Sequence, residues 1–297
     1  MATASTVPET RFGRKRAQET LKKAGFAQML RDSFVRFRVA DGTTHTRALA
    51  HSAVLTGVPA LIAVIGMASE FRMMDFQDVL KHSFQRLAPG TSGGFLESAF
   101  KQGSKSDGGS ELIVGSILAI VSGTFSFLQI ERGFNRIYGI DDDPALPQRL
   151  REGLLLTATA GAMLGISFIL LAAGGALGEA LSQGRTSSTL STAFAVLRWP
   201  LGLLITFAAL TLIFKRAPAR RQPGAGWLQS GTLMATALWF LFSVLLGIYY
   251  SVNDQLGQAF GPVLGIIATM TWAYATGLAL FLGAAFAAEL EAKASKA

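Results

Sequence analysis

The chain of 297 residues has no cysteine and only three histidines, and each shortage excludes a class of protein. Without cysteine there is neither a disulfide framework nor a thiolate metal site. The histidines, His45, His51 and His82, are not spaced as a metal-binding pair, and no HExxH, GxSxG or Walker A motif is present. We therefore expect no metal or other cofactor, no zinc hydrolysis and no ATP-driven transport.

Charge is missing from six long apolar segments, which together contain no Asp, Glu or Lys and a single Arg. A bilayer core about 30 Å thick needs roughly 20 helical residues, and each segment is close to or above that length. Soluble core helices rarely run so far without a charge that faces water. The predicted fold is therefore an all-α polytopic membrane protein with six transmembrane helices. They correspond to residues 49–68, 112–130, 154–177, 196–214, 228–250 and 263–288.

Lys and Arg are unevenly placed along the chain, and this predicts its orientation. Ten of the 27 precede the first apolar segment. If that tail is cytoplasmic, 20 basic residues lie inside and 7 outside, which satisfies the positive-inside rule with both termini inside. The sequence pI of about 10.0 is also typical of nucleic-acid binding. Because topology already requires these charges, and no base-stacking aromatic motif accompanies them, we expect no nucleic-acid partner.

Three regions follow from this reading. Residues 1–47 form a basic cytoplasmic tail, 48–290 the six-helix transmembrane domain with an outer loop at 69–111, and 291–297 a short cytoplasmic tail. Within the first tail, residues 11–39 are predicted to be helical, with apolar side chains at steps of three and four among surface arginines and lysines. Such an amphipathic helix either lies in the headgroup layer or packs under the bundle. The apolar residues are Phe26, Met29, Leu30, Phe34 and Phe37.

The apolar segments contain small residues and prolines. Gly161 and Gly165 form a GxxxG pattern that predicts close helix contact in the third segment. Pro59, in the first segment, is predicted to bend its helix. The acidic run 141–143 beside Pro144 is interpreted as a solvated turn rather than a cation site.

The most informative polar cluster is QIERGFNRIYG, residues 129–139, at the end of the second apolar segment. If the helix continues past this boundary, Arg132 and Arg136 share one face. Charge at membrane depth is costly unless paired, so we expect Glu131 to meet an arginine of its own or a neighbouring helix. One interpretation is a structural ion pair with cytoplasmic anchoring. The alternative is that Arg132, Arg136 and Arg151 bind a phosphate headgroup between helices.

Four stretches also carry a resemblance to a known family. FNRIYG, residues 134–139, resembles a signature of the YihY/virulence factor BrkB family of six-span inner-membrane proteins. LTGVP at 55–59, FGPVLG at 260–265 with MTWAY at 270–274, and LFLGAAFAAELE at 280–291 are similar to further motifs of that family, in the same order. Ala285 stands where the last of these motifs usually has its first glutamate. The resemblance implies a multi-pass protein of the bacterial plasma membrane.

The resemblance implies a link to envelope integrity and to lipid or lipopolysaccharide export. The first hypothesis is a transporter-like protein that moves a lipid or amphiphile, with lipid headgroups as its partners. Arg132, Asn135, Arg136 and Arg151 would hold the headgroup, Glu131 would orient the arginines and Pro59 would allow bending. The second is a non-transporting scaffold that recruits envelope partners. An enzyme is least favoured, because the residues do not support the family's older ribonuclease label. Homo-oligomerisation is left open.

Overall fold

The computed structural model describes residues 5–8, 14–70, 109–140, 144–171, 188–220, 222, 225–253 and 262–296. Regular structure in these ranges is entirely helical. The acidic run 141–143 and most of the predicted outer loop lie outside the described residues. The helices are α1 Arg14–Ala24, α2 Phe26–Val39, α3 Gly42–Glu70, α6 Gly109–Tyr138, α7 Leu146–Leu156, η1 Thr157–Gly161, α9 Ser188–Arg216, α10 Ala225–Val252 and α12 Pro262–Lys296.

Six of the described helical stretches are long and apolar enough to cross a bilayer, which confirms the predicted fold class. The third span is built from α7, the π-helical turn η1 and the helix that continues to Leu171. Several spans extend beyond their apolar segments into charged sequence. The second continues to Tyr138, so the polar cluster is helical as the prediction required. The spans are Gly42–Met67, Gly109–Tyr138, Leu146–Leu171, Val196–Arg216, Gln229–Val252 and Val263–Lys296.

Glycines allow two pairs of spans to pack at close range. A Cβ on Gly115 of α6 would lie 2.5 Å from the backbone nitrogen of Ala63 in α3, so only glycine fits this approach. In α10 and α12, Gly231 and Gly283 face each other in the same way. The predicted contact in the third span is wrong in one respect: within the described residues nothing lies within 4 Å of a Cβ on Gly165. Sequence spacing alone did not identify which small residues face a neighbour.

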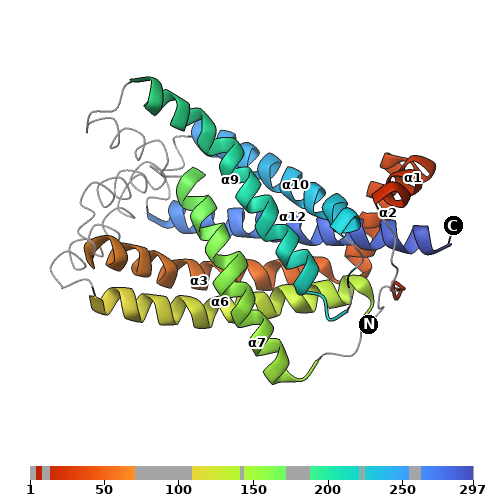
Figure 1. The fold of residues 1–297 in the computed structure, drawn as a ribbon, viewed down its shortest axis with the longest axis horizontal. Helices are drawn as coiled ribbons and strands as arrows, with labels where there is room; N and C mark the ends of the chain where they lie inside the picture. Colours follow the sequence, from red (N-terminus) through yellow and green to blue (C-terminus); the bar gives the residue numbers. More distant parts are fainter. Residues whose placement is uncertain are drawn as a thin grey trace.

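Both described ends of the chain lie at the same end of the bundle (Figure 1). Residues 5–8, helices α1 and α2, the last turns of α12, and the chain just after α6 and after α9 meet there. We call this the termini end. An even number of spans requires this arrangement, and the charge distribution predicts that the termini end is cytoplasmic.

In the described part of the basic tail, the single helix predicted over residues 11–39 is divided into α1 and α2. Gly25, with a φ of 78°, separates α1 from α2 in a left-handed conformation that glycine adopts at little cost. Met29 and Phe37 of α2 are buried, whereas Phe26 and Phe34 are exposed. The buried face of α2 packs against α12. Of the two interpretations of this amphipathic segment, packing under the bundle therefore holds for that face. Placement of the exposed face in the headgroup layer stays a prediction.

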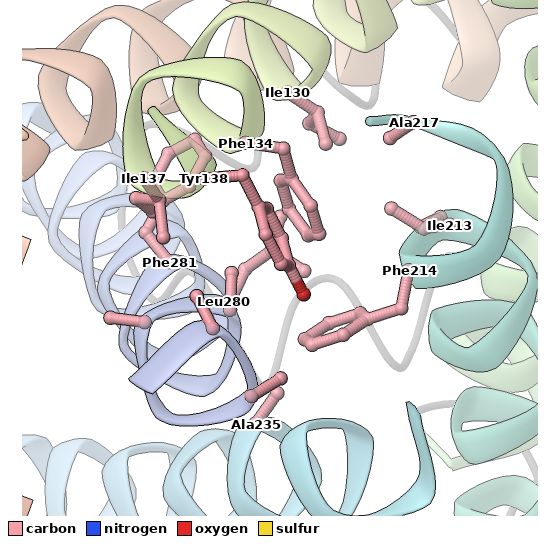
Figure 2. Close-up of a cluster of buried hydrophobic side chains, with 14 of the residues drawn as sticks. Ile130, Phe134, Ile137, Tyr138, Ile213, Phe214, Ala217, Ala235, Leu280 and Phe281 are labelled. Atoms are coloured by element: carbon pink, nitrogen blue, oxygen red, sulfur yellow. The ribbon is translucent and has the colours of Figure 1, made fainter. Parts of the chain in front are cut away.

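The main apolar core lies near the termini end and contains residues of all six spans; its aromatic centre joins α6, α9 and α12 (Figure 2). Phe134 of α6 packs edge-on against Phe214 of α9, with ring centroids 5.1 Å apart, and also against Phe281 of α12. The core therefore fixes the ends of α6, α9 and α12, from which the polar residues of the termini end project.

Pro59, which was predicted to bend its helix, lies inside α3, and the helix continues through it to Glu70.

Candidate functional site

The polar cluster of α6 divides between a buried and an exposed side of the helix. Glu131 forms an ion pair with Arg149 of α7, with Nε and Oε1 3.1 Å apart, which confirms the expected pairing with a neighbouring helix. Asn135 is buried, and its Oδ1 accepts a hydrogen bond of 2.9 Å from the backbone N–H of Ala219. These two residues tie α6 to α7 and to the chain after α9.

The arginines predicted to bind a headgroup are placed differently. Arg132 and Arg136 lie on the exposed side of α6, and Arg151 is exposed on α7, where it contacts Glu152 at 3.2 Å. Neighbouring helical positions point about 100° apart, so Arg132 does not share the direction of Glu131. The structure therefore brings Glu131 and Asn135 to one side and leaves the three predicted arginines on the outer surface.

A cavity of about 380 Å³ occupies the buried side of the cluster. It lies between α6, α7 and the segment 216–220, and we call it the termini-end cavity. Three arginines and two glutamates line it, so its formal charge is +1. Pockets for small molecules are typically about 300–1,000 Å³, which gives this one room for a polar headgroup. Its charged lining residues are Glu131, Arg149, Glu152, Arg216 and Arg220.

The cavity wall contains ion pairs of very different burial. Arg149 and Glu131 have side chains only 8% and 12% exposed, whereas Arg216 is 50% exposed and lies 3.5 Å from Glu152. Buried pairs of this kind are expensive to break, and exposed pairs contribute about 0–1 kcal/mol. The Arg149–Glu131 pair is thus a fixed part of the cavity wall. Arg216 is the lining arginine that can exchange its partner at the lowest cost.

A second charged layer closes the termini end behind the cavity. Arg220 donates to the carbonyl of Val7 at 2.9 Å, forms an ion pair with Glu291 of α12, and stacks over the ring of Tyr138 at 4.8 Å. Arg36 of α2 forms the second pair with α12, donating from Nε to Glu289 at 2.9 Å. Two glutamates two positions apart on α12 therefore hold two buried arginines from distant parts of the chain.

Sequence reasoning missed this layer. It counted Arg36 among the surface arginines of an amphipathic helix, but the side chain is 6% exposed. A signal was present, because Arg36 adjoins Phe37 and follows Met29 by seven residues, which places it on the buried face of α2. Arg220 offered no comparable signal, since its burial depends on how the chain folds back after α9.

Among the described residues, no group of three His, Asp or Glu side chains is arranged to hold a metal ion. The arginines that line the cavity support charge recognition by guanidinium groups. Arginine presents its N–H donors in a planar fork that matches the oxygens of phosphate and carboxylate.

The profile of the virulence factor BrkB family matches residues 33–297. A curated relative, the ribonuclease-like protein YfkH of Bacillus subtilis (strain 168), is 26% identical over 258 residues, which cover 86% of this chain and 92% of that protein. No solved structure gives a significant match. The stretches 134–139 and 280–291, which carry the resemblance, meet at the termini end through Tyr138, Arg220 and Glu291.

Proposed function

Because the chain belongs to the virulence factor BrkB family and is an integral membrane protein, we propose that it transfers an anionic lipid or amphiphile between leaflets without enzymatic turnover. The headgroup enters the termini-end cavity, at the cytoplasmic end of the spans. The observation that supports this proposal is the arginine-lined cavity at the boundary between apolar spans and charged sequence.

The cavity has the dimensions of a headgroup site. Its volume of about 380 Å³ accommodates a phosphate group with its substituent but not two acyl chains. The chains would remain outside, against apolar side chains of α7 that neighbour the lining residues. Leu150 and Leu154 are 37% and 47% exposed there. This division places the charged part of an amphiphile among arginines and its apolar part in the bilayer.

Recognition would begin at Arg216. Its pair with Glu152 is half-exposed, so a phosphate oxygen competes with the carboxylate at little cost. Charge-assisted hydrogen bonds to phosphate are roughly twice as strong as neutral ones. The outer arginines, Arg132, Arg136 and Arg151, would concentrate anionic lipid near the cavity, because basic residues at a membrane surface attract anionic headgroups.

A lipid-transfer assay in proteoliposomes tests the proposal. Purified protein is reconstituted with a fluorescent phosphatidylglycerol or phosphatidylcholine, and transfer to the outer leaflet is followed by dithionite quenching. We expect faster transfer of the anionic lipid than in protein-free vesicles. Loss of one charge-assisted hydrogen bond corresponds to about tenfold or more, so Arg216→Gln should slow transfer by about that factor.

The neighbouring Lys215 supplies a matched control. It is exposed on the same helix turn but does not line the cavity, so Lys215→Gln should leave the rate unchanged. Transfer equal to protein-free vesicles for both lipids would overturn the proposal. An unchanged rate in Arg216→Gln would overturn the assignment of the cavity.

A second candidate is the non-transporting scaffold. The buried pairs at Glu131, Glu289 and Glu291 favour it, because they rigidify the termini end. A scaffold predicts that deletion of residues 69–110 or of the first 40 residues abolishes function in cells, while Arg216→Gln has no effect. The transfer hypothesis predicts that the single substitution Arg216→Gln is sufficient to impair function in cells.

A further inference from the structure

Residues 5–8 are inserted into the termini end although they precede all the helices. Val7 is 4% exposed and belongs to the same core cluster as Phe134 and Phe214. Its backbone N–H donates to the carbonyl of Tyr138 at 3.1 Å, and Thr6 Oγ1 donates to the carbonyl of Gly139 at 3.3 Å. A short segment with no secondary structure of its own thus covers the end of α6.

Two buried arginines hold this segment from opposite ends. Arg36 donates to the backbone carbonyl of Ser5 at 3.1 Å and to its hydroxyl at 3.2 Å. Arg220 donates to the carbonyl of Val7 at 2.9 Å. Both guanidinium groups are anchored on α12 glutamates, so the segment is bound by groups that are already positioned for it.

Arg220 belongs to two sites at once. It lines the termini-end cavity, and it also holds the segment 5–8. Its side chain is 4% exposed, and its Nε is buried without a hydrogen-bond partner among the described residues. A buried donor that lacks an acceptor is costly, so the hydrogen-bonding capacity of Arg220 is incompletely used in this arrangement.

We propose that residues 5–8 form a plug over the termini end, and that Arg220 exchanges the Val7 carbonyl for an anionic phosphate group in the cavity. The exchange is favourable because a charged acceptor replaces a neutral one. Without that bond the plug keeps its hydrogen bonds to Arg36 and to two backbone carbonyls and the apolar contacts of Val7, so its docking is weaker and it leaves the end of the bundle more often. The identity of the ligand rests on the proposed function; docking of the plug does not.

The absence of cysteine makes the plug directly measurable. Val7→Cys and Thr6→Cys each introduce a single thiol, the first at a buried and the second at an exposed position of the same segment. Labelling by a polar maleimide is timed with full-length protein in detergent. Since labelling of a buried thiol follows the population of the open state, we expect Val7→Cys to react about tenfold more slowly than Thr6→Cys.

Three additions test the exchange at Arg220. Dihexanoyl phosphatidylglycerol should raise the labelling rate of Val7→Cys about tenfold, and dihexanoyl phosphatidylcholine should leave it unchanged. The third addition is inorganic phosphate. Release of the plug by phosphate alone would support the exchange and would assign a soluble anion as the ligand. Arg220→Gln in the Val7→Cys background should label fast with no addition.

The outcomes separate this inference from the proposed function. Equal labelling of Val7→Cys and Thr6→Cys would overturn the plug, even if Arg216-dependent lipid transfer is observed. A protected Val7→Cys that responds to none of the three additions would overturn the exchange. Anion-dependent release in a protein that transfers no lipid would support the plug and remove the transfer hypothesis.

Discussion

The Arg220–Glu291 pair provides a quantitative test of the closed termini end. The two side chains are 4% and 2% exposed, so removal of the carboxylate charge leaves an almost wholly buried guanidinium without its anionic partner. Breaking a buried pair in this way costs about 3–5 kcal/mol. Arg220 retains the Val7 carbonyl and the Tyr138 ring, and glutamine keeps the shape of the side chain. We therefore expect Glu291→Gln to destabilise the protein by about 3 kcal/mol, the lower end of that range.

The same helix supplies a control two residues away. Lys293 pairs with Asp32, but these side chains are 23% and 31% exposed. Exposed pairs contribute about 0.2–1 kcal/mol, so Lys293→Gln should have a small effect. The two substitutions thus differ in the burial of the pair, while the helix and its end are shared.

Thermal unfolding of purified protein in mild detergent, followed by tryptophan fluorescence, measures the difference. With about 2–4 °C per kcal/mol for a chain of this size, Glu291→Gln should lower Tm by about 6–12 °C and Lys293→Gln by at most about 4 °C. The double variant Arg220→Met/Glu291→Leu should recover most of the loss, since well-packed apolar residues replace a buried pair without penalty. Equal Tm shifts for the two single variants would refute the reasoning.

Two further predictions concern packing and topology. A Cβ on Gly133 would lie 2.3 Å from Phe281, so Gly133→Ala should cost about 1–3 kcal/mol in the same unfolding assay. Gly165→Ala meets no described atom within 4 Å and should change stability by less than about 1 kcal/mol. In intact cells, an impermeant maleimide should label Val252→Cys and not Ser295→Cys, because these exposed positions lie at opposite ends of the bundle. The reverse labelling would contradict the predicted orientation.

Local sequence was sufficient to predict the six spans and to predict that Glu131 pairs with a cation. Each span is an apolar run that must leave water, and its partition into the bilayer depends on its own composition and length. The pairing of Glu131 was also predictable, because a carboxylate at membrane depth needs a cation whatever the fold. Its partner was not, since Arg149 is only one of several arginines near the end of the second span.

The position of the proposed headgroup site was not predictable from the sequence. Helical spacing correctly placed Arg132 and Arg136 on one face of α6, yet that face is the outer surface. The cavity formed on the other side, because α7 and the segment after α9 pack against Glu131 and Asn135. A helical pattern gives the direction of a side chain relative to its own axis, but not which neighbour covers that direction.

The sequence by itself determined six membrane-spanning helices, a basic and an apolar part of the tail, and the need to neutralise each charge near the bilayer. Only the tertiary structure decided the pairs. Arg36 meets Glu289 across 253 residues, and Arg220 meets Glu291 across 71 and Val7 across 213. Hydrophobic partition is a property of each segment alone, whereas an ion pair requires two groups to approach within a few ångströms. That approach, and with it the plug and the cavity, exists only once the bundle has closed.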